Sequence, residues 1–192
     1  HNGDEVKETE GLYGPDLVSD YLCDFFERNR EKPFVAYYPM ILVHSPFVPT
    51  PDSPDWEKTD KKRGSLEHFR DMVQYMDKIV GKLVAKLEET GLREKTMIVI
   101  TGDNGTHSSL KSPFPGREEG FIQGGKGKMT DAGNRVAFVA NWPGTIPAGT
   151  EVDSPVDFAD ILPTIADVVG AHLPADSVGQ SWLPLALGEK PS

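Results

Sequence analysis

The stretch "VITGDNGTHSS", residues 99–109, sets an apolar run directly against an Asp-Asn-Gly sequence. Val99 and Ile100 close a segment typical of a buried strand. Asp103 and Asn104 then place two oxygen-bearing side chains just past its end. Asp-Asn-Gly is also common in simple turns, so this stretch alone leaves a turn and a metal site both open. The segments on either side indicate which interpretation the whole chain favours.

Regular elements are predicted on both sides of this stretch. Residues 65–91 carry apolar side chains at three- and four-residue steps, which predicts an amphipathic helix with Ser65 as N-cap and Gly91 after its end. Similar patterns predict helices over residues 14–30 and 157–170, the latter with Asp160 as N-cap. Strands are predicted over residues 32–44, 95–101 and 136–141. Their alternation predicts an α/β fold with a mostly parallel sheet flanked by helices.

Three polar clusters fall at or just beyond the ends of predicted strands, or in the loop between them, and open α/β sheets bind ligands at the carboxyl ends of their strands. Asp103 and Asn104 offer the oxygen ligands that a hard divalent cation prefers. His44 follows an apolar strand and could donate a proton or contact an anion, although a lone histidine is more often structural. Lys126 lies in the glycine-rich segment 123–136, where an ammonium group could neutralise an oxyanion. This convergence predicts a site.

Composition excludes several classes of protein. The 192 residues are 38% hydrophobic and 26% charged, which is typical of a globular domain with a stable core. The net charge of -10 excludes a nucleic-acid partner, because phosphate contacts require clustered Lys and Arg. No apolar run reaches the roughly 18 residues that span a bilayer. The single cysteine, Cys23, excludes an internal disulfide and is predicted to be a buried structural thiol.

Taken in order, these segments resemble the sulfatase family of the alkaline-phosphatase-like superfamily. The motifs that carry the resemblance are "HSPFVPT" (44–50), "TGDNG" (101–105), "GGKGKMTDAGNRV" (124–136) and "VDFADILPTIADVVG" (156–170). The resemblance covers roughly residues 12–188 and implies an alkaline-phosphatase-like fold that hydrolyses sulfate esters. It further implies that residues 12–192 are the central-to-late part of a catalytic domain, behind a disordered or extended lead-in over residues 1–11.

The resemblance also implies roles for individual residues. Asp103 and Asn104 would be ligands of the family's divalent metal, which is usually Ca²⁺. Lys126 would bind the sulfate group and steady the leaving oxygen, and His44 would contact sulfate and help to protonate that oxygen. Two-metal relatives commonly carry His where this chain has Asn104, which favours one hard metal and a sulfate ester. The implied substrate is a sulfated small molecule or carbohydrate, and secretion or periplasmic export is expected.

One expected motif is missing from these residues. The family's nucleophile is a formylglycine made from Cys or Ser within a C-x-P-S-R type motif, whereas Cys23 is followed by Asp-Phe-Phe. The prediction is therefore a fragment without the N-terminal formylglycine half, inactive alone. Two alternatives remain: a phosphodiesterase or phosphonate-ester hydrolase of the same superfamily, and a non-catalytic binding protein. Loops 45–64 and 105–123 are expected to be exposed and to shape the pocket, with Trp56 either stacking on a sugar or packing within its loop.

Overall fold

The computed structural model describes residues 3, 7, 11–59, 64–113 and 120–189. The chain divides into two compact units, His1–Arg93 and Glu94–Ser192. The predicted lead-in over residues 1–11 falls largely outside the described residues. No described helix is both long enough and apolar enough to cross a membrane.

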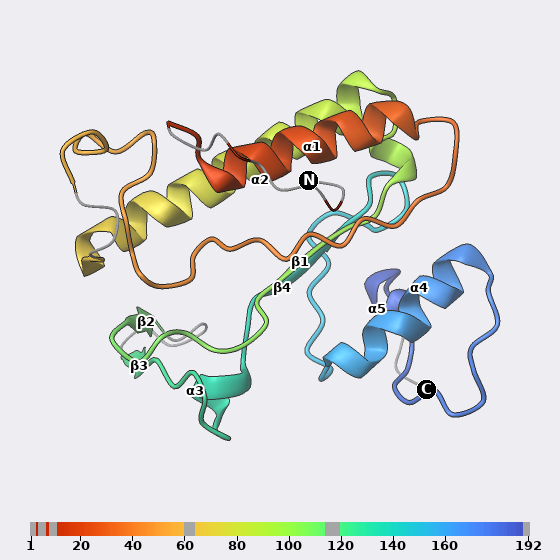
Figure 1. Cartoon of the computed structure of the whole chain (residues 1–192). Helices are drawn as coiled ribbons and strands as arrows, with labels where there is room; N and C mark the ends of the chain where they lie inside the picture. Colours follow the sequence, from red (N-terminus) through yellow and green to blue (C-terminus); the bar gives the residue numbers. More distant parts are fainter. Residues whose placement is uncertain (1–2, 4–6, 8–10, 60–63, 114–119, 190–192) are drawn as a thin grey trace. The chain divides into compact units, whose positions relative to one another are not determined.

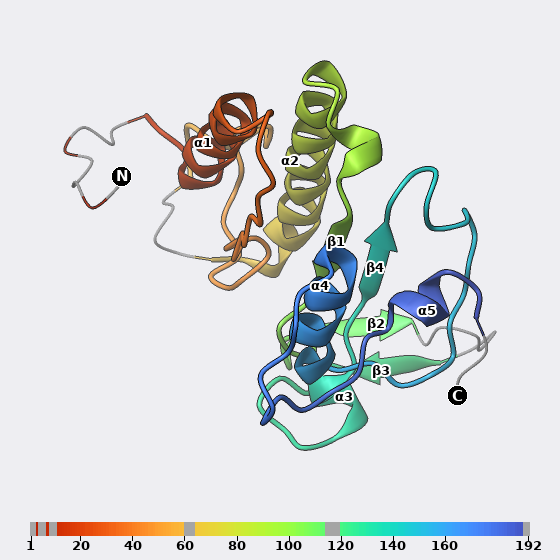
Figure 2. The same ribbon diagram turned by 90° about the vertical axis from the view of Figure 1, so that its right-hand side faces the viewer.

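Two long helices lie side by side in the first unit (Figures 1 and 2). Helix α1 spans Gly14–Arg28. Helix α2 spans Phe69–Glu89 and directly follows the 3-10 turn η1, Leu66–His68. Across the pair, the Tyr75 hydroxyl donates to Asp16 Oδ2 at 2.7 Å. The side chains that form the core of this unit include Phe26, Met72, Tyr75, Ile79 and Leu87. Both helices are confirmed where the apolar periodicity predicts them.

The ends of the second helix also follow their predicted residues. Ser65 Oγ accepts a hydrogen bond from the backbone N–H of Glu67 at 3.4 Å, ahead of the first turn. Gly91 adopts a φ of 72°, and the Leu92 N–H donates back to the Leu87 carbonyl at 2.8 Å. A left-handed residue of this kind closes a helix by satisfying its last carbonyls, and glycine adopts that conformation without steric cost.

Residues 32–44 form neither helix nor strand and end in a turn at Leu42–Val43, which corrects the prediction of a strand for this segment. A β-strand exists only through ladder hydrogen bonds to a neighbour, and no described strand pairs with residues 32–44. Val35, Tyr37 and Ile41 are exposed. The aromatic and β-branched composition suits a strand, but composition does not supply the partner that the segment needs.

The second unit contains two antiparallel strand pairs (Figure 2). Strand β1, Ile98–Thr101, pairs with β4, Phe138–Asn141, with Thr101 opposite Phe138. Strand β2, Lys111–Pro113, pairs with β3, Phe121–Gln123. The strands predicted over residues 95–101 and 136–141 are therefore present.

The direction of pairing differs from the predicted mostly parallel sheet, because both described pairs are antiparallel. Figure 1 shows the chain leaving β1, passing through β2, β3 and the four-residue helix α3, Asp131–Asn134, and returning to β4 from the same end. A parallel pair would require a crossover that returns to the opposite end of β1. The polar segment between the strands turns back instead.

The helix predicted over residues 157–170 is present, but its N-cap differs from the predicted Asp160. A 3-10 turn, η3 (Phe158–Asp160), runs into helix α4, Ile161–Val169, which ends at the left-handed Gly170. Asp157 Oδ1 accepts from the Ala159 N–H at 2.6 Å, and Asp160 Oδ2 accepts from the Asp157 N–H at 2.9 Å. Asp157 is therefore the N-cap and Asp160 its reciprocal partner, because the helical segment starts one turn earlier than the pattern predicts.

Trp182 joins three elements of the second unit. It is 4% exposed and precedes the short helix α5, Leu183–Ala186. Its ring meets Phe138 of β4 edge to face, with centroids 5.3 Å apart. Its backbone N–H donates to Thr164 Oγ1 of α4 at 3.0 Å. This packing holds β4, the strand that follows the polar segment between β1 and β4.

Candidate functional site

Backbone hydrogen bonds hold together the two ends of the polar segment between β1 and β4. The Gly102 N–H donates to the Ala137 carbonyl at 3.4 Å, and the Gly105 N–H donates to the Gly133 carbonyl at 2.7 Å. These contacts continue the antiparallel pairing beyond the last residue of β1. The loop that carries Asp103 is therefore held against the chain that leads into β4.

Asp103 and Asn104 lie on this supported loop and keep their side chains available. Asp103 is exposed and Asn104 is half-buried. Neither side chain forms a hydrogen bond or ion pair with another described residue. A carboxylate and an amide oxygen fit a hard divalent cation, which takes six or more oxygen ligands. The pair can supply only part of such a coordination sphere.

A second loop, which carries Lys126, contacts the backbone just after Asn104. The Lys126 backbone N–H donates to the Thr106 carbonyl at 3.0 Å, and the Gly124 N–H donates to the Leu110 carbonyl at 2.9 Å. Lys126 is exposed, and its ammonium group forms no ion pair with a described residue. Three of the four predicted site residues thus lie on two loops whose backbones touch. The Asp103 carboxylate and the Lys126 ammonium group therefore belong to neighbouring segments.

Glycine is required where these loops meet. A Cβ on Gly105 would strike the Ala132 carbonyl oxygen, one on Gly124 the His107 carbonyl oxygen, and one on Gly133 the Lys128 carbonyl oxygen. The contacts are therefore backbone to backbone, with no room for side chains. The sequence signal for this packing is the run of glycines on both sides of the contact.

His44 belongs to the first unit, whereas the other three site residues belong to the second. It is exposed, its Nδ1 lies 2.6 Å from the Ser45 carbonyl oxygen, and its backbone N–H donates to the Ile41 carbonyl at 2.8 Å. The contact with Ser45 orients the imidazole and leaves Nε2 for another group. The convergence of His44 with the other three residues stays a prediction.

The loop after His44 is less exposed than predicted. Residues 45–59 contain no helix or strand, as expected, but Phe47, Pro49 and Thr50 are buried. Trp56 is half-buried, and its ring meets Tyr13 edge to face at 5.5 Å. Proline and charge indicated a loop correctly, while the apolar side chains between them pack into the unit. Trp56 follows the packing alternative.

Cys23 is half-buried on α1, and burial raises the pKa of its thiol, with Asp20 adding to the increase and Lys82 opposing it. A protonated thiol is a weak nucleophile. This environment agrees with a structural thiol, although the side chain is less buried than the sequence pattern predicts.

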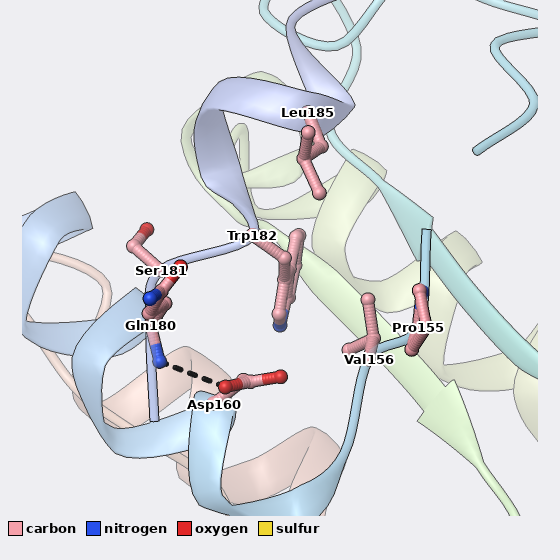
Figure 3. A pocket seen from close by; sticks show the side chains of 7 residues that line it. All are labelled: Pro155, Val156, Asp160, Gln180, Ser181, Trp182 and Leu185. Carbon is pink, nitrogen blue, oxygen red and sulfur yellow. Dashed lines mark hydrogen bonds between the residues drawn. The ribbon is translucent and has the colours of Figure 1, made fainter. Parts of the chain in front are cut away.

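A pocket of about 330 Å³ lies beside α4 and contains Asp160, Gln180 and Trp182 in its lining (Figure 3). Asp160 Oδ1 accepts from the Gln180 N–H at 2.8 Å, so both of its oxygens already hold backbone donors. The indole Nε1 of Trp182 is buried and has no hydrogen-bond partner among the described residues. The Asp160 carboxylate in this pocket therefore holds the start of η3 and the backbone at Gln180, which is a structural role.

Comparison with known proteins gives consistent matches. A family model described as "Sulfatase" matches residues 7–171. The chain is 34% identical over 172 residues to a steryl-sulfatase from Rattus norvegicus, covering 86% of this chain and 28% of that protein. The chain therefore spans less than a third of that relative's length.

Solved structures match along nearly the whole chain. Ps i-CgsB has a TM-score of 0.76 at 30% identity, over 98% of this chain and 41% of its own. The same protein in complex with k-i-k-neocarrahexaose has a TM-score of 0.74 at 31% identity, over 96% and 40%. The phosphonate monoester hydrolase SpPMH from Silicibacter pomeroyi has a TM-score of 0.61 at 22% identity, over 94% and 42%, which is a likeness of fold alone.

Proposed function

The chain belongs to the sulfatase family, and from that premise we propose that its residues serve the hydrolysis of a sulfate ester within the whole protein. The observation that carries the proposal is the backbone contact between the Asp103–Asn104 loop and the Lys126 loop. This contact joins the segment of the two proposed cation ligands to the segment of Lys126. The bound cation and the Lys126 ammonium group, both positive, would stabilise a bound sulfate.

Asp103 and Asn104 would hold a divalent cation, and their oxygen donors suit Ca²⁺. When bound, such a cation polarises a substrate oxygen and offsets charge that develops there. The remaining ligands and the formylglycine nucleophile would come from residues beyond the 192 considered, since no C-x-P-S-R type motif occurs among them.

Lys126 and His44 would act on the two sides of the ester bond. The Lys126 ammonium would neutralise the sulfate oxygens and the leaving oxygen, an interaction that strengthens as negative charge develops in the transition state. His44 would donate a proton to the departing alkoxide from Nε2, because Nδ1 already faces the Ser45 carbonyl. Placed in this way, each group stabilises charge that is small in the substrate and large in the transition state.

The proposed substrate is a sulfated carbohydrate or a small sulfate ester. Support comes from Ps i-CgsB, whose complex contains a neocarrahexaose, and from the steryl-sulfatase named above. The net charge of -10 would repel an anionic substrate at long range. The cation and Lys126 would therefore have to offset that repulsion locally.

The test compares substrates and variants of the full-length protein. We expect turnover of an aryl sulfate ester well above that of matched aryl phosphate and phosphonate esters. Lys126→Ala should lower kcat by about a hundredfold or more, whereas Lys128→Ala, an equally exposed lysine two residues away, should change it little. A chelator should abolish activity, and added Ca²⁺ should restore it.

Two results would count against the proposal. Preference for the phosphonate ester would assign the protein to the other hydrolase class. Equal loss from the Lys126 and Lys128 substitutions would show that Lys126 has no special place in the reaction.

A further inference from the structure

Asp55, His68 and Asp71 form a cluster in the first unit that the proposed hydrolysis does not use. Asp55 comes from the loop before α2, His68 ends the 3-10 turn η1, and Asp71 lies in the first turn of α2. One potential ligand atom from each residue lies within 4.8 Å of the others. The spacing in the sequence gives no motif, so sequence analysis did not identify this cluster.

His68 is a buried residue whose two ring nitrogens each face one carboxylate at ion-pair distance. The residue is 8% exposed. Its Nε2 lies 3.6 Å from Asp55 Oδ2 and its Nδ1 lies 3.7 Å from Asp71 Oδ2. Hydrogen bonds from N–H groups to oxygen are usually 2.7–3.2 Å long, and buried polar groups normally make them. Both separations are longer than a hydrogen bond, so each ring nitrogen has room for a closer partner between it and its carboxylate.

Both carboxylates are held in place by hydroxyl groups. Ser53 Oγ donates to Asp71 Oδ2 at 2.6 Å, and Thr59 Oγ1 donates to Asp55 Oδ2 at 2.7 Å. The bond from Thr59 is the main cause that lowers the pKa of Asp55, so this carboxyl is ionised near neutral pH. Metal-binding carboxylates are commonly oriented by hydrogen bonds of this kind.

Two carboxylates and one imidazole make up the cluster. Among the described residues, neither Asp55 nor Asp71 forms an ion pair with a lysine or arginine, and Lys58 acts on Asp55 only at longer range. Their side chains are 41% and 29% exposed, which leaves an open side for water ligands. A dication would balance the two carboxylates and supply the imidazole with a partner.

We propose that Asp55, His68 and Asp71 form a binding site for a divalent transition-metal ion of the Zn²⁺ type. One nitrogen and two carboxylate oxygens suit Zn²⁺, Mn²⁺ or Co²⁺ better than Ca²⁺, which prefers oxygen alone. Bonds of 2.0–2.2 Å in a tetrahedral site separate the ligand atoms by about 3.4 Å. The 3.6 Å between His68 Nε2 and Asp55 Oδ2 is close to that separation. Asp71 Oδ2 faces the other ring nitrogen, Nδ1, at 3.7 Å, so the Asp71 side chain would have to turn toward Nε2 when the ion binds. The ion would fasten the loop before α2 to the start of the helix.

The test measures Zn²⁺ and Co²⁺ binding to the 192-residue chain with Asp103→Ala, which removes the other proposed cation site. We expect one Zn²⁺ bound, and visible absorption from Co²⁺ that shows nitrogen and oxygen ligation. Asp55→Asn and His68→Gln should each weaken Zn²⁺ binding at least about tenfold. Asp52→Asn and His172→Gln are matched controls outside the cluster and should leave binding unchanged.

Asp55→Asn keeps the test decisive if His68→Gln fails to fold, because Asp55 lies at the exposed edge of the cluster. The absence of Zn²⁺ binding to the folded chain would overturn the proposal. So would equal affinity in Asp55→Asn and Asp52→Asn. His68 would then be a simple ion-pair partner of the two aspartates.

Discussion

Individual glycines determine how closely the two site loops approach each other. Gly105 and Gly133 are joined by a 2.7 Å backbone hydrogen bond. A Cβ on Gly105 would strike the backbone at Ala132 in the other loop, and a Cβ on Gly133 would strike the Lys128 carbonyl oxygen within the Lys126 loop itself. Gly81 is a useful contrast, because it lies exposed within α2 and a Cβ there would meet nothing within 4 Å. The same residue type therefore has opposite effects at the two places.

We predict that Gly133→Ala destabilises the chain by about 2 kcal/mol, since overpacking against fixed backbone typically costs 1–3 kcal/mol. Gly81→Ala should instead stabilise it by about 0.5–1 kcal/mol, because alanine favours a helix interior. Chemical denaturation of the two variants measures both values. A neutral Gly133→Ala would mean that the backbone around Lys128 shifts easily and that the Lys126 loop is not tightly packed.

At the scale of elements, the α1–α2 pair depends on tyrosines that stay protonated. Tyr75 is 4% exposed and donates to Asp16, while the Tyr13 ring meets Tyr75 edge to face at 5.1 Å. Burial, with the Asp16 carboxylate, raises the pKa of Tyr13 to about 12. Burial and the hydrogen bond to Asp16 raise the pKa of Tyr75 further.

These directions predict alkaline unfolding. The folded state holds the tyrosine protons more tightly than the unfolded state, whose tyrosines titrate near pH 10. The stability linked to them is therefore complete below about pH 10 and is lost as pH rises toward 12. Denaturation midpoints measured across this range should fall, and less steeply in Tyr75→Phe. The exposed Tyr37→Phe serves as control, and an identical fall in both variants would contradict the assignment.

At the scale of the whole molecule, the proposed site needs more groups than these residues offer. Asp103 and Asn104 would provide two cation ligands where six or more are needed, and no C-x-P-S-R type motif occurs in the 192 residues. The chain spans 28% of the steryl-sulfatase that it matches. We therefore expect the proposed chemistry to need more than these 192 residues.

We accordingly predict that the purified 192-residue chain releases no sulfate from an aryl sulfate ester, whereas the full-length protein does. Ion chromatography of released sulfate measures both. Metal-dependent turnover by the chain alone, lost on Asp103→Ala, would mean that these residues complete a site by themselves.

Local patterns in the sequence determined most of the elements and the kinds of chemistry available. Apolar side chains at helical spacing predicted α1, α2 and α4, and the β-rich runs predicted β1 and β4, because these signals depend on neighbours within a few residues. Asp103, Asn104 and Lys126 were identified in the same way, from oxygen and ammonium groups that follow predicted strands. Their roles in a reaction remain predictions.

Only the tertiary structure decided which segments meet. It left residues 32–44 without a strand partner, paired β1 with β4 antiparallel, and set the loop of Asp103 against that of Lys126. It also assembled Asp55, His68 and Asp71 from a loop and a helix start. A strand's partner and a cluster's members are set by contacts between residues distant along the chain. Those contacts depend on how whole elements pack, which the order of residues does not reveal locally.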